Sequence, residues 1–353
     1  MICHYCDFYT ARSKDARHDE LFAALHLELN SIRDRLAPKL KAIYFGGGTP
    51  GVSPPELLAK FLGKLLPFTD SDAEITLEVN PNNVRAETVG AWADAGFNRL
   101  SMGIQSLRPE LLKKLSRTHS GDDALRALEL CLTKFQNVTG DLIYGVPDQG
   151  ELVPAEDAER LATLGLSHVS AYHLSLAPKH FLFSKLPDDQ LAYKQIKSLS
   201  TSLESRGFQH YEISNLGKPG FESRNNMNYW LGGPYLALGP SAHGYDGAAL
   251  RWHNIANWEE YCSRLQRGES AVNEQEQLSL EQRKIEYLFT RLRLKLGINL
   301  KEFERLFQVD LAASRSALFP QLEQAGFGEL VNGQFIPTFE GRMLGDDLVQ
   351  KFL

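Results

Sequence analysis

Two cysteines close to the start of the chain have the clearest potential for chemistry. Cys3-His4-Tyr5-Cys6 forms a C-x-x-C pair ahead of any predicted helix or strand. Two thiolates at this spacing can hold one metal centre, and sulfur ligands suit iron and zinc. Half of a zinc site, a redox pair and two unrelated cysteines are the alternatives. The other two cysteines, Cys131 and Cys262, are predicted to be buried packing residues.

A glycine-rich segment is the second candidate. Gly46-Gly47-Gly48-Thr49-Pro50 follows the apolar run 42–45. Glycine leaves the backbone uncovered, so a small polar ligand can form close hydrogen bonds with the main chain. A tight strand-to-helix turn would also explain the glycines, but Thr49-Pro50 and the location at the end of a predicted strand favour ligand contact.

Two carboxylates lie in apolar strand patterns. Glu78 is part of the predicted strand 74–79, and Asp141 is part of the predicted strand 138–144. A carboxylate in such surroundings needs a partner, because its charge is costly to bury alone. The partner is either a salt bridge in the core or the polar group of a ligand.

These residues lie on a regular alternation of elements between residues 41 and 213. The predicted strands are 42–45, 74–79, 99–104, 138–144, 168–174 and 208–213. The predicted helices are 54–66, 86–95, 109–115, 122–135, 155–164 and 188–205. Strands separated by such helices form parallel βαβ units, so we expect six parallel strands in an open doubly wound sheet or a full or partial TIM-type barrel. Both folds gather functional groups at the carboxyl ends of the strands, where Gly46–Pro50, Asn80-Pro81, Gln105-Ser106 and Asp148 lie.

The pattern changes after about residue 215. Residues 215–250 are rich in glycine, asparagine and aromatic residues, and short helical segments follow from Leu278. Asn332-Gly333 stands between two apolar runs, which is a strong hairpin signal. We therefore predict a core over residues 1–215, an extension over 216–275 and a small α+β C-terminal domain, winged-helix-like in its pattern, over 276–353.

Composition excludes several classes of protein. The net charge is −6, the apolar fraction is 43% and the charged fraction is 23%, as expected for a globular protein rather than a nucleic-acid binder. No run of about 18 apolar residues predicts a transmembrane helix, and no basic-then-apolar leader is visible. Four cysteines without a disulfide-like pattern favour a reducing cytoplasm.

Several ordered motifs together resemble one family. Cys3–Phe8 resembles the end of the C-x-x-x-C-x-x-C loop of radical S-adenosylmethionine (SAM) proteins, and Gly46–Pro50 resembles their glycine motif. Further matches, in family order, are Glu78-Val79-Asn80-Pro81, Ser101–Ser106, Arg117-Thr118-His119 and Asp141–Pro147. The chain therefore resembles the oxygen-independent coproporphyrinogen III oxidase family over nearly its whole length. The resemblance implies a radical SAM barrel.

The resemblance also implies cofactors and the residues that hold them. Cys3 and Cys6 correspond to two of the three ligands of a [4Fe–4S] cluster, whose free iron binds SAM and whose electron splits it to a 5′-deoxyadenosyl radical. The first cysteine would lie two residues before Met1 together with the first barrel strand, so we expect Met1 to be an internal position of a longer protein. The residues that correspond to SAM contacts are Tyr5, Gly47, Gly48, Thr49, Glu78, Gln105, Arg117, Asp141 and His173. Among these, the resemblance places Tyr5 and His173 near the adenine of SAM and makes Arg117 a partner of a carboxylate. His119 has either a functional or a structural role.

Two positions assign the chain to the haem-chaperone branch of that family. The oxidases carry a further cysteine where this chain has Phe8. Asn225–Trp230 resembles the His-Asn-x-x-Tyr-Trp motif of the branch, although Asn225 replaces the histidine proposed to contact haem, and an amide is a poor haem ligand. His210, His243 and His253 are the remaining donors nearby, and none is singled out by spacing. Tyr229 and Trp230 either line a face for a porphyrin or pack in the core.

The function expected from this resemblance is that of a haem chaperone that binds SAM and haem. We expect SAM cleavage by the full-length form and no oxidase activity; the alternatives are a coproporphyrinogen III oxidase, a non-catalytic haem carrier and a zinc protein. The expected partners are haem or porphyrin, haem-receiving proteins and an electron donor, with peripheral membrane association and no nucleic acid.

Overall fold

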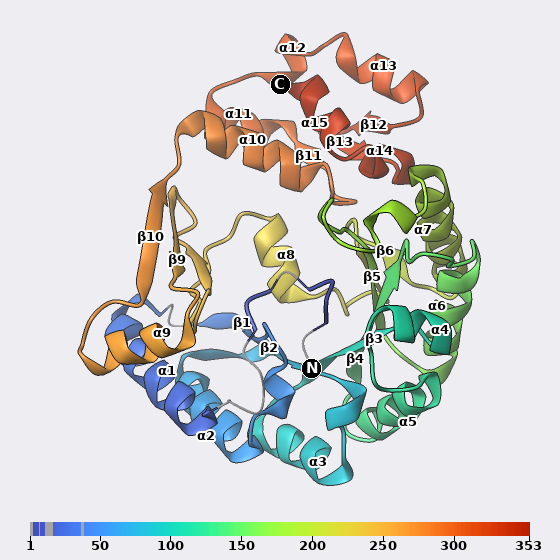
Figure 1. Ribbon diagram of the computed structural model, residues 1–353. Helices are drawn as coiled ribbons and strands as arrows, with labels where there is room; N and C mark the ends of the chain where they lie inside the picture. Colours follow the sequence, from blue (N-terminus) through green and yellow to red (C-terminus); the bar gives the residue numbers. More distant parts are fainter. Residues whose placement is uncertain (1–2, 7, 11–16, 37–38) are drawn as a thin grey trace.

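A curled, mostly parallel sheet forms the larger part of the molecule. The computed structural model describes residues 3–6, 8–10, 17–36 and 39–353. Within these residues the strands of this sheet follow the order β1-β2-β3-β4-β5-β7-β6, and β1 to β5 pair in parallel. Helices cover its outer face, so that the sheet and helices form an incomplete barrel (Figure 1). The parallel strands are Leu40–Phe45 (β1), Thr69–Val79 (β2), Arg99–Gln105 (β3), Asn137–Tyr144 (β4) and His168–His173 (β5).

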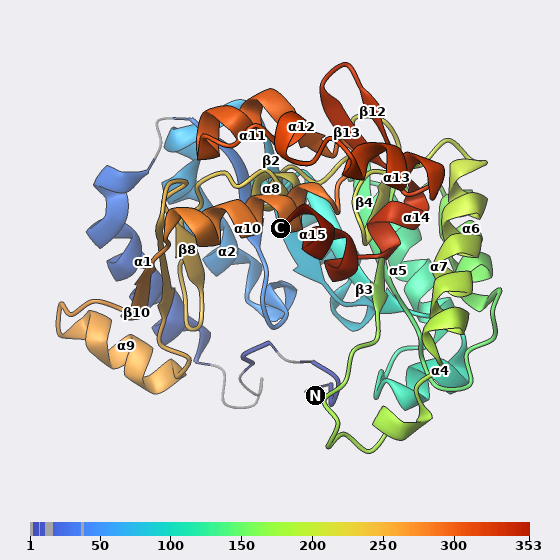
Figure 2. The same ribbon diagram turned by 90° about the horizontal axis from the view of Figure 1, so that it is seen from above.

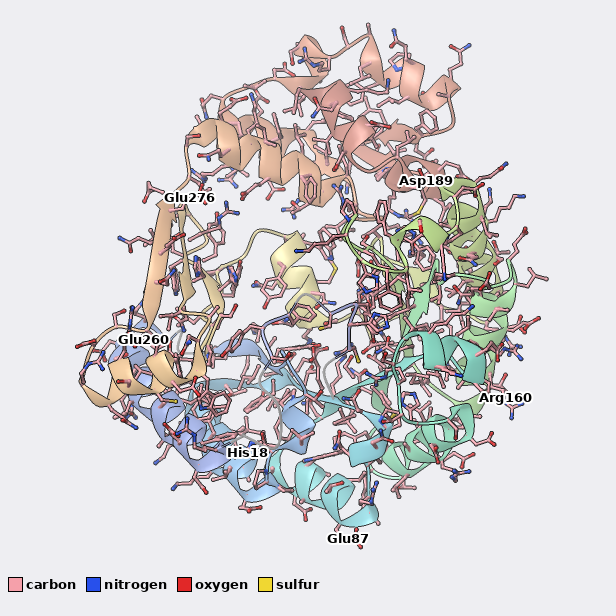
Figure 3. All side chains as sticks on the ribbon, viewed as in Figure 1. His18, Glu87, Arg160, Asp189, Glu260 and Glu276 are labelled. Carbon is pink, nitrogen blue, oxygen red and sulfur yellow. The ribbon has the colours of Figure 1, made fainter. Side chains whose placement is uncertain are left out.

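The covering helices begin and end where local residues favour it. In α5, Ser120 and Asp123 form a reciprocal capping box at the first turn. Both α3 and α6 end at a left-handed glycine, Gly96 and Gly165. Glu87 on α3 and Arg160 on α6 point away from the sheet (Figure 3). The helices are His18–Ile32 (α1), Pro55–Leu65 (α2), Ala86–Ala95 (α3), Pro109–Lys114 (α4), Gly121–Leu132 (α5), Val153–Leu164 (α6) and Asp189–Glu204 (α7).

Alternation along the strands separates two faces. Apolar residues such as Leu77, Leu100 and Val169 belong to the main core between sheet and helices. The residues between them, which face the inside of the barrel, include Glu78, Ser101 and others with polar side chains. The sheet therefore presents a polar concave face at which ligands can bind.

The sixth predicted strand differs from expectation. The segment 208–213 was expected to extend the parallel sheet, but only Gln209–His210 (β6) is a strand. It pairs antiparallel with Asn215–Gly217 (β7), and β7 in turn pairs antiparallel with β5. Only four residues separate β6 from β7, which is enough for a chain reversal but too short for a parallel crossover. The prediction of six adjacent parallel strands is therefore wrong at its last member.

A second, antiparallel sheet stands across the open side of the barrel. Its strands are His243–Tyr245 (β8), Leu250–Asn254 (β9) and Val272–Gln277 (β10), in the order β10-β9-β8. Trp258–Gln266 (α9) packs against α1, and Arg224–Trp230 (α8) lies inside the ring formed by the two sheets (Figure 1).

The C-terminal part has a core of its own. Buried residues between Tyr287 and Phe352 form a separate apolar cluster. The Asn332-Gly333 turn has positive φ at both residues, 52° and 78°, which is the conformation of a tight hairpin turn, and the predicted hairpin is confirmed. The elements are Leu280–Arg291 (α10), Ile298–Asn299 (β11), Leu300–Phe307 (α11), Leu311–Ser314 (α12), Leu318–Gln324 (α13), Gly328–Val331 (β12), Gln334–Pro337 (β13), Phe339–Met343 (α14) and Asp346–Phe352 (α15).

Short 3-10 turns complete the described elements. They are Arg33–Arg35 (η2), Pro50–Val52 (η3), Leu66–Phe68 (η4), Pro81–Asn83 (η5) and Phe183–Lys185 (η6). In the described part of the chain, no helix is long and apolar enough to cross a bilayer. The predicted limits at residues 215 and 275 stay predictions; β7 and β10 extend across them.

Candidate functional site

The two predicted carboxylates lie on the concave face of the barrel, not toward the helices. Glu78 accepts a hydrogen bond of 2.7 Å from the Tyr44 hydroxyl, and the nearby Gly47 backbone N–H helps to lower its pKa. Asp141 accepts from the Ser101 hydroxyl, which lies 3.1 and 3.2 Å from its two oxygens. Neither carboxylate forms an ion pair within 4.0 Å among the described residues, so each keeps the capacity to bind a cationic group.

Burial changes the ionisation of both groups. It raises the pKa of Glu78 to about 7, and nearby Asp141 adds to this effect, while the bonds from Tyr44 and Gly47 oppose it. It raises the pKa of Asp141 to about 6, against hydrogen bonds from Ser170 and Ser101 and the charge of Arg99. Both carboxyls therefore change charge near neutral pH, and a cationic ligand would favour their ionised form.

The glycine segment after β1 packs against the Glu78 side chain. A Cβ on Gly46 would lie 2.5 Å from the Tyr44 ring and 3.0 Å from a Glu78 oxygen, so only glycine fits there. Gly47 has a φ of 110°, which suits a residue without a side chain. Thr49 accepts a hydrogen bond of 2.8 Å from the Asn80 amide. The backbone N–H and C=O groups of this segment, including those of Gly48, therefore lie at the carboxyl end of the sheet.

Arg117 joins the cysteine loop to two strand ends. Its Nη2 donates to the Gly103 carbonyl at 2.6 Å and to the Asn80 side-chain oxygen. Its Nη1 lies 3.7 Å from the Sγ of Cys3. Gln105 follows with a left-handed φ of 71° and folds its side chain back over Gly103. The structure therefore brings Arg117, Gln105 and Cys3 together.

The cysteine loop rests on the barrel through its middle residues. The N–H of Cys6 bonds the Cys3 carbonyl at 3.2 Å, and both thiols are partly exposed. Tyr5 packs against a buried apolar cluster that includes Leu111 and Ile143. Burial raises the pKa of the Tyr5 hydroxyl, and the charge of Arg117 opposes that rise.

The residues fit an iron–sulfur cluster in part. Cys3 and Cys6 provide two thiols beside the carboxyl ends of the strands, where a cluster would need its ligands. Cys131 and Cys262 are buried in two different apolar clusters and do not approach the loop. No group of three possible metal ligands occurs among the described residues. The chain therefore provides two of the three cysteines that such a cluster takes.

Two predicted histidines lie outside this group. The His173 ring lies beside the Tyr144 ring, 5.2 Å between centroids, on the side of β5 that faces the helices. His119 is 4% exposed, and its Nε2 donates to the Ile104 carbonyl at 3.0 Å. Burial and Arg117 lower the pKa of His119 to about 4, so its ring is neutral, and these contacts favour the structural role.

The floor of the barrel contains an ion pair that sequence reasoning missed. Arg99 Nε lies 3.7 Å from a Glu74 carboxylate oxygen, and both side chains are nearly fully buried. Arg99 also donates to the Thr139 hydroxyl at 2.6 Å. Glu74 accepts the backbone N–H of Arg224 at 3.1 Å, which caps the first turn of α8. Glu74 and Arg99 occupy the same alternate positions as Glu78 and Ser101, and that register is the signal that could have revealed them.

The candidate haem residues have very different surroundings. His210 is fully buried, and its ring nitrogens bond Ser200 at 2.9 Å and the Ile213 carbonyl at 3.2 Å, so it cannot reach a ligand. His243 and His253 are opposite each other on β8 and β9, with ring centroids 5.3 Å apart. Tyr229 is 45% exposed, whereas Trp230 is half-buried near Glu212, and its indole N–H helps to lower the pKa of that carboxyl.

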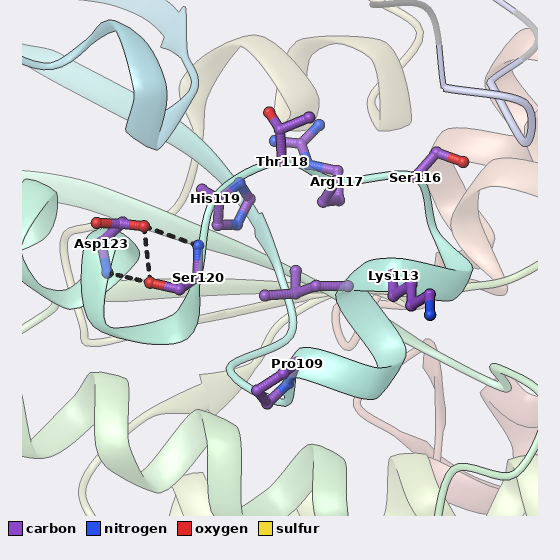
Figure 4. A pocket seen from close by; sticks show the side chains of 9 residues that line it. Pro109, Lys113, Ser116, Arg117, Thr118, His119, Ser120 and Asp123 are labelled. Carbon is purple, nitrogen blue, oxygen red and sulfur yellow. Dashed lines mark hydrogen bonds between the residues drawn. The ribbon is translucent and has the colours of Figure 1, made fainter.

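Two surface hollows lie beside the polar face rather than over it. One, of about 440 Å³, is formed by α4, the start of α5 and the Arg117-Thr118-His119 loop between them (Figure 4). The other, of about 460 Å³, is lined by His4, Lys114 and Phe181 among others. Of the predicted SAM residues, Arg117 lines the first of these hollows.

Known proteins share both parts of this architecture. The profile of the Radical SAM superfamily matches residues 1–162, and that of the HemN C-terminal domain matches residues 278–344. The structure is similar to that of coproporphyrinogen III oxidase (HemN) from Escherichia coli, with a TM-score of 0.83 and 20% identity, covering 100% of this chain and 87% of that one. This similarity shows the fold.

Sequence similarity identifies the family. The chain is 32% identical to the heme chaperone HemW of Lactococcus lactis over 371 residues, covering 100% of this chain and 94% of the relative. It is 29% identical to the heme chaperone HemW of Bacillus subtilis, covering 100% and 96%, and 31% identical to that of Haemophilus influenzae, covering 99% and 94%. The chain therefore belongs to the HemW family of the radical SAM superfamily.

Proposed function

We propose that this protein is a haem chaperone that binds a [4Fe–4S] cluster, SAM and haem. The observation that carries this proposal is the group formed by Cys3, Arg117, Glu78 and Asp141 at one end of the barrel, together with the paired imidazoles His243 and His253 across the ring. The family's cluster and SAM supply radical chemistry when they are bound.

The chain's own residues have separate tasks in holding SAM. Cys3 and Cys6 are cluster ligands, and Tyr5 borders them. The carboxylates Glu78 and Asp141 attract the cationic groups of SAM, and the backbone of Gly47 and Gly48 offers hydrogen-bonding groups beside Thr49. Arg117 and Gln105 orient the carboxylate end, although Arg117 is already bonded to Asn80 and Gly103 and has only part of its guanidinium left for a ligand. His173 is the weakest of these assignments, because its ring faces the helices.

Haem is assigned to the inner face of the second sheet. His243, Tyr245, Arg251 and His253 project from the same face of β8 and β9. Tyr245 lies near Tyr235, which contacts Tyr229 of α8, so aromatic rings stand beside the imidazoles. Such rings suit a flat porphyrin, and an imidazole nitrogen suits its iron.

His243 is the preferred iron ligand. No described residue hydrogen-bonds its ring nitrogens, whereas His253 Nε2 lies 3.3 Å from Glu274. Partial burial and the neighbouring His253 and Arg251 lower the pKa of His243, which keeps the ring neutral and able to bind iron. Glu274 fixes the His253 ring through its contact with Nε2, and the His253 ring in turn lies against the His243 ring.

Haem titration of single variants tests this assignment. His243→Ala should weaken haem binding at least about tenfold and remove the Soret shift of a histidine complex. His26→Ala, on α1, is the matched control and should bind as the unaltered protein does. Asn225→His, which restores the motif histidine, should strengthen binding. Equal haem affinity in His243→Ala and the unaltered protein would exclude His243 as the iron ligand.

The proposal includes partners and a compartment. Cys3, Cys6, Cys131 and Cys262 are free thiols, which suits a reducing compartment such as the cytoplasm. An electron donor is required for SAM cleavage. Haem-receiving proteins and a membrane surface, with which the protein associates peripherally, complete the expected partners.

A further inference from the structure

One helix of the C-terminal part contacts both structures that border the proposed haem site. α10 lies beside α8 and β8 (Figure 2). Its residue Arg291 bonds the end of α8, and its residue Glu286 pairs with Arg251 of β9 at 2.6 Å. α10 itself belongs to a different core, because Leu288 packs in the C-terminal apolar cluster. Residues of α10 can therefore act on the haem site from outside it.

The guanidinium of Arg291 caps the carboxyl end of α8. Its Nη1 donates to the Trp230 carbonyl at 2.8 Å, and its Nη2 donates to the Leu231 carbonyl at 3.3 Å. The last carbonyls of a helix have no donor within the helix, and a positive charge beside them is favourable. Arg291 is 7% exposed, so water and salt screen this contact little.

The C-terminal part holds Arg291 in place. The guanidinium lies over the Tyr287 ring, 4.7 Å from its centroid, and 3.6 Å from a Glu302 carboxylate oxygen. The Tyr287 hydroxyl donates to the same carboxylate at 2.7 Å. The planar guanidinium is therefore oriented by its own domain, and the end of α8 is positioned against it.

α8 depends on contacts of this kind, because Arg224–Trp230 is only seven residues long. A helix of this length is not stable on its own. Its first turn is bonded by Glu74, which accepts the Arg224 N–H at 3.1 Å, and its last turn is bonded by Arg291. A carboxylate at the amino end and a guanidinium at the carboxyl end both suit the helix dipole. Loss of Arg291 therefore leaves one end of α8 without its charged partner.

The carboxyl end of α8 is connected to His243 through three tyrosines. Tyr229 meets the Tyr235 ring edge-on, with 4.6 Å between centroids. Tyr235 and Tyr245 exchange two backbone hydrogen bonds of 2.9 Å, and Tyr245 is two residues from His243 on β8. A shift of the end of α8 therefore changes the aromatic surface beside the proposed iron ligand.

We infer that Arg291 is a positioning residue of the haem site. It holds the end of α8, and with it Tyr229, while the Glu286–Arg251 pair holds β9 to the same helix. α10 thereby fixes the separation between α8 and the second sheet, so that a flat porphyrin meets aromatic rings while His243 binds its iron. This inference rests on the proposed function, because it concerns how haem is held, but it requires no iron–sulfur cluster.

Haem titration of the full chain without an iron–sulfur cluster tests the inference. Arg291→Gln removes the charged cap of α8, and we expect the Kd for haem to rise at least about fivefold. The Soret band should keep the position of a histidine complex, because His243 is unchanged. Arg291→Lys, whose ammonium cannot reach both carbonyls, should raise the Kd at least about threefold. Glu302→Gln, the matched control, removes the ion pair of Arg291 but not its bonds to α8, and should change the Kd less than about twofold.

A double-variant cycle separates positioning from a general loss of structure. In the Tyr229→Ala background the ring that Arg291 positions is absent, so adding Arg291→Gln should change the Kd by less than about twofold. Effects that simply multiply in the double variant would overturn the inference, as would an unchanged Kd in folded Arg291→Gln. Arg291→Lys decides the question by the same two criteria if Arg291→Gln does not fold.

The same titrations distinguish this inference from the proposed function. If the unaltered protein binds no haem, the proposed function is wrong, and the role of Arg291 falls with it. If haem binds through His243 and its Kd ignores Arg291, only the positioning role is wrong.

Discussion

The guanidinium of Arg117 lies 3.7 Å from the thiol of Cys3 and at the same time bonds Asn80 and the Gly103 carbonyl. A residue from the loop after α4 thus joins the N-terminal cysteine loop to the ends of β2 and β3. The planar, forked donor set of arginine is needed for this, because three acceptors lie in different directions. The position of Cys3 therefore depends on Arg117.

Replacing Arg117 should loosen the cysteine loop without unfolding the protein. In Arg117→Lys one ammonium group cannot reach all three partners. We expect the Cys3 and Cys6 thiols to react several times faster with a disulfide reagent, and the reconstituted protein to lose iron faster, while the melting temperature changes little. Arg126→Lys, at the exposed pair with Asp123, is the matched control. Unchanged thiol reactivity in Arg117→Lys would contradict this dependence.

The pKa of Glu78 near 7 predicts a stability that falls as pH rises. The folded state keeps the Glu78 proton up to about pH 7, while an unfolded glutamate releases it near 4.5. Between these values the folded state binds more protons, so the free energy of unfolding decreases with pH, by up to about 3 kcal/mol by pH 8. Asp141, with a pKa of about 6, adds a loss of the same sign.

Glu78→Gln isolates this effect, because the amide oxygen can still accept from Tyr44 but cannot ionise. Urea unfolding of the metal-free protein between pH 5 and 8 should show a clearly smaller decrease in the variant than in the unaltered protein. Asp141→Asn should give a second, smaller reduction in slope. Parallel pH curves for all three proteins would show that neither carboxyl has a raised pKa.

The buried pair Glu74–Arg99 predicts a large cost for removing one partner. Arg99→Met leaves the Glu74 carboxylate without its guanidinium in the floor of the barrel, and we expect a loss of about 3 kcal/mol in urea unfolding. Adding Glu74→Gln removes the unpaired charge, so the double variant should be more stable than Arg99→Met alone. Arg224→Met, which breaks the exposed pair with Asp72, should cost less than about 1 kcal/mol.

Much of the barrel could be predicted because its strands show apolar alternation and are separated by segments with a clear helical pattern. Strands 99–104 and 138–144 combine apolar alternation with helices between them, and helix 86–95 ends at Gly96, so their limits are confirmed within a residue or two. The second sheet lacks such signals. The strand Val272–Gln277 is mostly polar and exposed, and its pairing with β9 depends on contacts distant in the sequence.

The site residues that belong to short sequence motifs could be predicted. Those whose contacts depend on how neighbouring strands pair could not. Glu78, Asp141 and Arg117 stand in short motifs, and the structure groups them. Arg99 stands in a motif-free strand position, and its partners Glu74 and Thr139 come from neighbouring strands. The burial of His210 also could not be read from sequence, because Ser200 and Phe339 enclose it from α7 and α14.

Phe8 predicts the absence of oxidase activity. Its side chain is 72% exposed at the position where the oxidases carry a further cysteine, and phenylalanine provides no thiol for redox or metal chemistry. We therefore expect the protein, extended to carry a third cluster cysteine and then reconstituted, to produce no protoporphyrinogen IX from coproporphyrinogen III under anaerobic, reducing conditions, while it binds haem. Product formation above the level of a Cys3→Ser, Cys6→Ser control would support the oxidase alternative.

A third cysteine placed ahead of the chain should complete the cluster site. Two added residues, with cysteine first, put that cysteine four positions before Cys3 and create the spacing C-x-x-x-C-x-x-C. The chain as printed offers two clustered thiols, and a [4Fe–4S] cluster of this type takes three. We expect anaerobic reconstitution to raise iron from a substoichiometric level to about four per chain. The same extension with serine in place of the added cysteine is the control, because it has equal length and no thiol. Equal, full iron loading of the cysteine and serine forms would show that the added thiol is not a cluster ligand.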